Sequence, residues 1–168
     1  LLERAVSKFV PADDLVVPYS ATSLEDAEAI IHVVKISEND LRKQQVNGFY
    51  RDVELTPPED VEDKVTKKER ELEGTRKAGK TENMYTLLEC HINLDIEGFE
   101  DIGQDNEPTG IRLPYIVTID EGSREVLSIK RNFEQNDPKK QKINYFVHFK
   151  FLPGLGFYGF GLIHMIGG

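Results

Sequence analysis

The feature that most constrains the fold is an alternation of apolar and polar residues in the stretch MYTLLECHINLD, residues 84–95. Successive side chains of a β-strand point to opposite faces of the sheet, so this pattern predicts a strand with one core face and one solvent face. The residues expected on the core face are Met84, Leu88, Cys90, Ile92 and Leu94. The residues expected on the solvent face are Glu89, His91, Asn93 and Asp95.

Three further segments have the composition of strands: residues 113–120, 125–132 and 143–151. A short turn around Gly122 joins the first two of these segments. In the last segment, one face holds Tyr145, Val147, Phe149 and Phe151, and the other largely holds Asn144, His148 and Lys150. Four consecutive strands with turn-rich connections predict an antiparallel β-meander with one core face and one solvent face.

Sequence patterns in the N-terminal third of the chain predict the elements that cover this meander. Residues 10–19 read as a short extended segment, and Ser23 is placed to cap a short helical turn. Residues 29–36 are apolar and β-branched, which predicts a buried strand. Ser37 is the expected N-cap of a helix that stops at Gly48. We expect the helices and this early strand to cover the core face. The predicted fold class is α+β: an antiparallel β-meander of about four strands packed with a few helices.

Length and charge limit the number of domains and the kinds of partner that the chain can have. The chain has 168 residues and a net charge of −9. We predict a single α+β domain over residues 1–168, with a charged, mobile insertion at about 57–83. The acidic balance argues against a surface that grips DNA, because phosphate binding needs clustered Lys and Arg. No apolar run reaches the ~18 residues of a membrane span. A first residue other than Met and an apolar, glycine-rich end suggest a fragment of a longer polypeptide.

The glycine-rich stretch Gly154-Leu155-Gly156-Phe157-Tyr158-Gly159 admits two interpretations. It has the GxGxxG form and follows an expected strand, as in a dinucleotide-binding loop. Against this, dinucleotide-binding sheets are parallel, whereas the expected meander is antiparallel. The alternative is that the glycines supply unusual backbone dihedrals while the aromatic residues pack. Nucleotide binding by residues 154–159 therefore remains the alternative function.

Other residues that could carry chemistry give weaker signals. A metal site assembled from His91, His148 and an Asp is possible, but a histidine on the solvent face of a sheet is commoner. Residues 100–108, EDIGQDNEP, lack the spacing of a calcium loop and read as a long hairpin loop. Cys90, the one cysteine, is expected to be an inert core thiol. We therefore predict no catalytic residue, no cofactor, no cofactor-binding residue and no metal ligand.

Several phrases together resemble one protein family. They are VPADDLVVPYSATSLEDAEAIIHVVKISENDLRK, YTLLECHINLDIEGFED, LPYIVTIDEGSREVLSIKRNF and YFVHFKFLPGLGFYGFGLIHMIGG. These phrases resemble the portal proteins, or head-to-tail connectors, of short-tailed bacteriophages and prophages. The resemblance covers nearly the whole chain except the charged insertion, and its closing phrase is the most specific.

The resemblance implies a structural protein and not an enzyme. Portals form a ring, usually a dodecamer, at one vertex of the virion, and double-stranded DNA passes through it without sequence-specific binding. The terminase, scaffold and tail-completion proteins are the implied partners, and assembly takes place in the bacterial cytoplasm with no membrane. This chain would be an internal, wing-like fragment, which by itself we expect to be a monomer or weak dimer. The candidate subunit-packing residues are Phe151, Phe157, Tyr158 and Phe160. A third interpretation is another virion or adaptor protein that binds a partner through residues 57–83.

Overall fold

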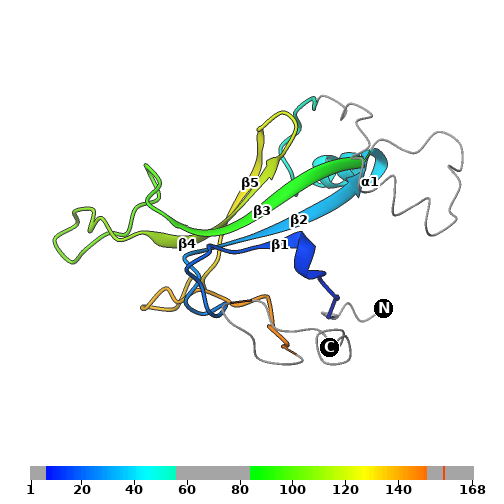
Figure 1. The fold of residues 1–168 in the computed structure, drawn as a ribbon. Coiled ribbons are helices and arrows are strands. Elements are labelled where there is room, and N and C mark those ends of the chain that lie inside the picture. The colour runs from blue at the N-terminus through cyan, green and yellow to red at the C-terminus, as the bar shows by residue number, and fades with distance from the viewer. Residues whose placement is uncertain (1–6, 56–83, 151–156, 158–168) are drawn as a thin grey trace, which may run out of the picture. The chain divides into compact units, whose positions relative to one another are not determined.

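A meandering β-sheet organises the structure. The computed structural model describes residues 7–55, 84–150 and 157. Within these ranges the chain forms five antiparallel strands in the order β1-β2-β3-β4-β5, so each strand lies beside its neighbour in sequence (Figure 1). The strands are β1 (Leu15–Val16), β2 (Ala29–Ser37), β3 (Met84–Leu94), β4 (Leu113–Asp120) and β5 (Val126–Arg131). With a helix added to this meander, the predicted α+β fold class is confirmed.

The helix α1 (Glu38–Val46) begins and ends where the sequence predicted. Ser37 is its N-cap, and its Oγ accepts a hydrogen bond from the backbone N–H of Asp40 at 3.2 Å. This bond satisfies one of the N–H groups that the first helical turn leaves unpaired. Gly48 follows with a φ of +72°, a conformation that glycine adopts without a steric penalty. A short 3-10 turn (Ala12–Asp14) precedes β1.

The chain divides into two compact units. Unit 1 comprises Leu1–Val33, Glu89–Val117 and Ile129–Gly168, and unit 2 comprises Val34–Leu88 and Thr118–Ser128. Each unit has its own cluster of buried apolar side chains. The single domain expected over residues 1–168 stays a prediction.

Unit 2 has a core built from α1, β3 and β5 with the segment that follows the helix. Its buried members are Leu41, Tyr50, Leu55, Tyr85, Leu87 and Leu127. Gln45 is a buried polar residue at the edge of this core, and its Nε2 donates a hydrogen bond to the carbonyl oxygen of Val53 at 2.8 Å. The backbone of the same segment is tied to β5 by the N–H of Arg51, which donates to the carbonyl oxygen of Leu127 at 2.8 Å.

Unit 1 has a core built around the loop that precedes β2. Its buried members are Ala21, Leu24, Ala27, Ile30 and Phe157, and the half-buried Leu15, Val17 and Phe146 pack against them. Within the loop, Thr22 and Ser23 donate hydrogen bonds to the carboxylate of Asp26, from Thr22 Oγ1 at 2.7 Å and from the Ser23 N–H at 2.8 Å. Ser23 Oγ also accepts a hydrogen bond from the N–H of Asp26 at 3.2 Å, as expected of a capping residue, but the residues that follow form no helical turn, so that part of the prediction is wrong.

Over residues 85–91, the core face of β3 is the opposite of the one predicted, whereas Asn93 is exposed as predicted. Tyr85, Leu87 and His91 are buried, with exposed fractions of 5%, 0% and 7%, whereas Met84 is 41% exposed. Cys90 is half-buried and so does not lie in the core as expected. The physical reason is that both faces of residues 84–88 carry large apolar side chains, so the prediction depended on the polar residues that follow. One of these, His91, is buried among aromatic rings and so indicated the wrong face.

Two expected strands also differ from the structure. Strand β2 does not cover the meander, because it lies inside the sheet and pairs with β1 through Leu15 opposite His32 and Val16 opposite Ile31. Residues 143–150 form no strand, although their apolar and polar side chains alternate. Residue 151 and the charged insertion at 57–83 lie outside the described residues.

The two hairpin connections of the meander were predicted correctly. The connection between β3 and β4 contains the expected long loop, and Ile102 and Pro108 form an isolated antiparallel β-bridge within it. The connection between β4 and β5 is the short turn around Gly122, closed by the N–H of Asp120 donating to the carbonyl oxygen of Glu125 at 3.0 Å.

Two neighbouring leucines of β3 test which of its faces is the core face. Replacing Leu87, which is fully buried, by Ala should lower the free energy of unfolding by about 2–5 kcal/mol, because it removes buried methyl groups and leaves a cavity. Replacing the half-buried Leu88 by Ala is the matched control and should cost clearly less. Urea denaturation followed by circular dichroism measures both. An equal or larger loss for Leu88→Ala would contradict the assignment.

Candidate functional site

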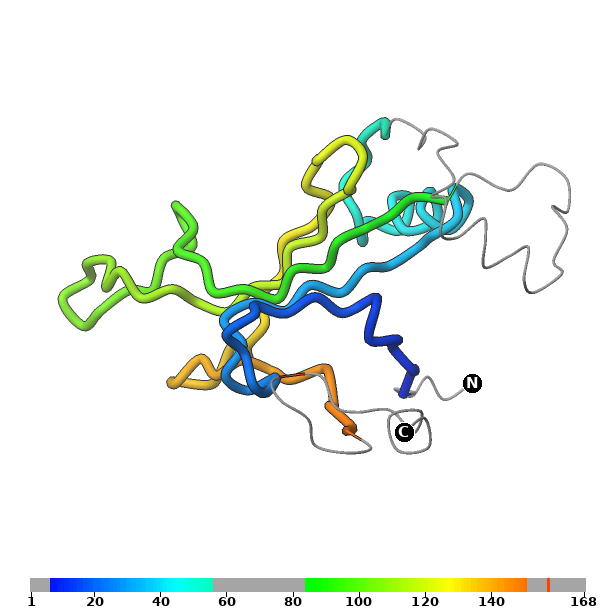
Figure 2. Tube along the Cα trace, viewed as in Figure 1, coloured from blue at the N-terminus to red at the C-terminus, as the bar shows by residue number. Residues whose placement is uncertain are grey.

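The candidate site is the extended segment of residues 143–150, here called the arm, which follows β5 in unit 1. The N–H of Ile143 donates to the carbonyl oxygen of Asn132 at 3.0 Å, and this bond ties the start of the arm to the end of β5. Beyond it, residues 144–149 form no hydrogen bond with any part of the chain that the structure describes. The arm is therefore held by its side chains. Figure 2 shows it in orange, beside the blue loop that precedes β2.

Phe146 is the inward anchor of the arm. Its ring packs against the buried cluster of unit 1, which includes Leu24 and Ile30. It also meets His91 with the ring centroids 5.1 Å apart and His32 with the centroids 5.6 Å apart, both edge to face. This is a favourable geometry for aromatic pairs, so β2 and β3 both hold the same ring.

The second anchor is His148, two residues further along the arm. Its ring stacks on Phe157, with centroids 4.2 Å apart and an angle of 19° between the planes. Two lysines add contacts to the loop before β2: the Nζ of Lys142 donates to the carbonyl oxygen of Leu24 at 3.5 Å, and the Nζ of Lys150 donates to that of Thr22 at 3.4 Å. Phe146, His148 and Lys150 thus hold the arm, whereas Asn144 is exposed.

Tyr145, Val147 and Phe149, on the other side of the arm, are exposed, although the ring of Tyr145 also lies edge to face with His91 at a centroid distance of 5.9 Å. Tyr145 is 60% exposed, Val147 95% and Phe149 88%. Sequence analysis grouped these residues on one face correctly, but that face is exposed. Three large apolar side chains on one short segment are more than the scattered exposed residues of an ordinary surface, and such patches mark interaction sites.

The histidines at the anchor have distinct electrostatic surroundings. His32 Nδ1 lies 2.9 Å from the Oε2 of Glu89, close enough for a hydrogen bond or an ion pair. Burial lowers the pKa of His91; the nearby His32 and Lys142 lower it too, while Glu89 opposes them. Burial also lowers the pKa of His148. The neutral forms of His91 and His148 therefore suit the folded state.

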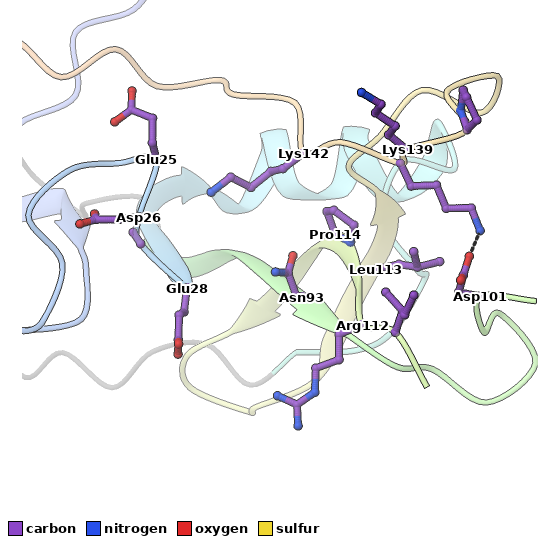
Figure 3. A pocket seen from close by; sticks show the side chains of 14 residues that line it. Glu25, Asp26, Glu28, Asn93, Asp101, Arg112, Leu113, Pro114, Lys139 and Lys142 are labelled. Carbon is purple, nitrogen blue, oxygen red and sulfur yellow. Dashed lines mark hydrogen bonds and ion pairs between the residues drawn. The ribbon is translucent and has the colours of Figure 1, made fainter. Parts of the chain in front are cut away.

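A hollow of about 530 Å³ lies beside the base of the arm, within unit 1. Its lining includes acidic residues from the loop before β2 and basic residues from the segment just before the arm (Figure 3). The acidic ones are Glu25, Asp26 and Glu28, and the basic ones are Lys139, Lys140 and Lys142, with Arg112 and Asp101 from the β3–β4 connection. Lys140 is paired with Asp101, as the dashed line in Figure 3 marks.

Two carboxylates that line the hollow are held in their ionised form by hydrogen bonds and by a nearby lysine. Hydrogen bonds from Thr22 and Ser23 hold the pKa of Asp26 at about 2, so its carboxylate is ionised at neutral pH. The bond from Lys140, together with one from Thr109, lowers the pKa of Asp101. The lining contains no His, Cys or Ser. Lys142 extends toward the segment that carries Glu25 and Asp26 (Figure 3).

The other residues considered for chemistry lie apart from these features. Burial raises the pKa of the Cys90 thiol, which favours the protonated, unreactive form. Among the residues that the structure describes, no group of three or more His, Cys, Asp or Glu is placed to hold a metal ion. The alternative metal site on His91, His148 and an Asp is therefore not formed by this part of the chain.

Of the candidate subunit-packing residues, Phe157 is the one that the structure describes. It is 7% exposed and lies in the buried cluster of unit 1, so nearly all of its surface is covered by its own chain. Phe151, Tyr158 and Phe160 lie outside the described residues, as does the rest of the glycine-rich stretch at 154–159.

Sequence reasoning missed the exposed face of the arm. The alternation at 144–150 was visible, and so was the absence of acidic residues in this part of the chain. The signal that could have found the exposed face is the isolated Phe146, an aromatic residue among the polar positions Asn144, His148 and Lys150. An aromatic residue at that position indicates that the polar face has a buried contact.

Comparisons with models of protein families, with curated proteins and with solved structures gave no match. In the described ranges, none of the helices has the length and apolar character needed to cross a membrane. The functional argument therefore rests on the arm, the hollow and the sequence.

The buried position of His91 predicts a loss of stability in mild acid. Because its pKa is lowered in the folded state, the unfolded chain binds the proton more tightly, so stability is complete above the ordinary value of about 6.5 and falls as the pH decreases through it. His91→Phe removes the titration but keeps a ring against Phe146. The variant should lose less stability than wild type between pH of about 7.5 and 5, measured by urea denaturation at each pH.

His148→Phe is the matched control for this experiment. His148 is less buried than His91, so its replacement should reduce the loss of stability in acid by a smaller amount. If His91→Phe lost as much stability in acid as wild type, His91 would not be the group responsible.

Proposed function

We propose that the chain is the wing-like region of a bacteriophage portal subunit within a longer polypeptide, and that its role is structural. The observation that carries this proposal is the exposed apolar face of the arm, formed by Tyr145, Val147 and Phe149. Residues 146–150 of the arm open the stretch FVHFKFLPGLGFYGFGLIHMIGG, the most specific part of the resemblance to portal proteins. A surface of this kind suits a protein that assembles with copies of itself.

The fold class agrees with this proposal without being specific to it. A wing region is expected to be α+β, and the chain has a meander with a helix. Fold alone does not imply function, so the argument depends on the arm and on the sequence phrases. The proposed partners are neighbouring subunits in a ring, with the terminase, scaffold and tail-completion proteins on the assembled connector.

The charge of the chain is compatible with a conduit for DNA. A net charge of −9 repels the phosphate backbone of DNA. DNA slides more easily through a ring that contacts its phosphates weakly. Within the described residues, the lysines at the base of the arm lie beside carboxylates of the hollow, which offsets their attraction for phosphate. The proposed function includes no catalytic step and no bound cofactor.

Negative-stain electron microscopy of the complete gene product that contains this chain tests the proposal. Rings with a central hole and about a dozen equal subunits are expected, because a portal assembles around a DNA channel. Compact monomers at high protein concentration would refute it. In that case, a nucleotide-induced rise in melting temperature that Gly156→Val abolishes would support the alternative, nucleotide binding by residues 154–159.

A further inference from the structure

His91 lies where the arm meets the sheet within unit 1. Its side chain is buried, at 7% exposure, and its ring meets those of Phe146 and Tyr145 edge to face at centroid distances of 5.1 Å and 5.9 Å. Together with the first residues of the arm, His91, Leu24 and Ile30 enclose a space of about 10 Å³. That volume is at the lower limit for one water molecule, so a charge on the imidazole would gain almost no hydration there.

The charged groups around His91 disfavour a positive charge on its ring. Glu89 lies on the same strand, but its Oε2 is already 2.9 Å from Nδ1 of His32 on the neighbouring strand β2. Lys142 lies just before the arm, where its Nζ donates to the carbonyl oxygen of Leu24 at 3.5 Å. A protonated His91 would share one carboxylate with His32 and repel Lys142. In agreement, burial lowers the pKa of His91, and His32 and Lys142 lower it further against the effect of Glu89.

The arm is the side of this contact that can give way. His91 belongs to β3, which lies between β2 and β4 in the sheet. Residues 144–149 form no hydrogen bond with the part of the chain that the structure describes, so side chains alone hold them. A segment held in this way opens at a lower free energy than a strand inside a sheet. An unfavourable charge on His91 is therefore relieved by movement of the arm.

The histidine of the arm itself is placed differently. His148 stacks on Phe157 with the ring centroids 4.2 Å apart, and a positive charge over an aromatic face is attracted to it. Its ring is half-buried, whereas that of His91 is buried. Burial lowers the pKa of His148, and the charged groups near it, Lys150 and Glu25, act on that pKa in opposite directions. Protonation of His148 therefore leaves its contact with the unit in place.

We infer that protonation of His91 releases the arm from unit 1 while the sheet stays folded. Release takes Phe146 out of the buried cluster and so removes the contact that orients Tyr145, Val147 and Phe149. The arm presents one fixed apolar surface at neutral pH and loses it in mild acid. The inference goes beyond the proposed function and does not depend on it, because it concerns the attachment of the arm and not its partner.

The direction and the size of the effect follow from proton linkage. Release returns His91 to its ordinary pKa of about 6.5, whereas attachment of the arm holds that pKa lower. Attachment is therefore fully favourable above about pH 6.5 and weakens as the pH falls below that value. The ratio of attached to released arm should decrease by up to about 30-fold between about pH 7.5 and about pH 5.

Nuclear magnetic resonance of the isotope-labelled chain tests the inference over this pH range. On acidification, the amide signals of residues 144–149 should move toward random-coil positions, while those of β2 to β5 keep their dispersion. Relaxation dispersion of the same signals measures the released population while it is still small. His91→Phe and His91→Leu each remove the titrating group, and whichever of them folds should keep the arm attached at about pH 5. His148→Phe is the matched control and should release its arm nearly as wild type does.

Any of three results would overturn the inference. The first is a folded wild-type chain whose arm signals stay unchanged down to about pH 5. The second is a loss of dispersion in the sheet together with the arm, since the acid effect would then be global unfolding. The third is release of the arm in the His91 variants at the same pH as in wild type. Each result leaves the proposed function to be judged by the microscopy of the complete gene product.

Discussion

The burial of one aromatic ring, that of Phe146, determines how the arm is displayed. The ring packs against the core of unit 1 and against the edges of His32 and His91. Because successive side chains of an extended segment point in opposite directions, placing Phe146 inward turns Val147 and Phe149 outward. The candidate interaction surface is therefore a consequence of a buried contact on the other side of the same backbone.

The arm is attached by side chains, and this has a consequence for its stability. From residue 144 to residue 149 it forms no hydrogen bond with the described residues, so its position depends on ring contacts and on the lysines that reach loop carbonyls. Segments with few backbone hydrogen bonds open locally at a lower free energy than strands of a sheet. His91 couples that attachment to pH, since protonation places a charge beside Lys142 and His32.

Charge is unevenly distributed along the chain, and the fold brings opposite charges together in the hollow. The loop before β2 supplies carboxylates and the segment just before the arm supplies lysines, which meet across the hollow within one subunit.

The sequence by itself determined the local elements: the strands β3, β4 and β5 with their two hairpin connections, and helix α1 between Ser37 and Gly48. These follow from local chemistry, because a capping hydroxyl, a glycine stop and an alternating pattern act within a few residues. The tertiary structure alone decided which face of each extended segment is buried. A period of two has the same form whichever face meets the core, so Leu87 rather than Leu88 is buried, and Val147 is exposed because Phe146 has the buried contact.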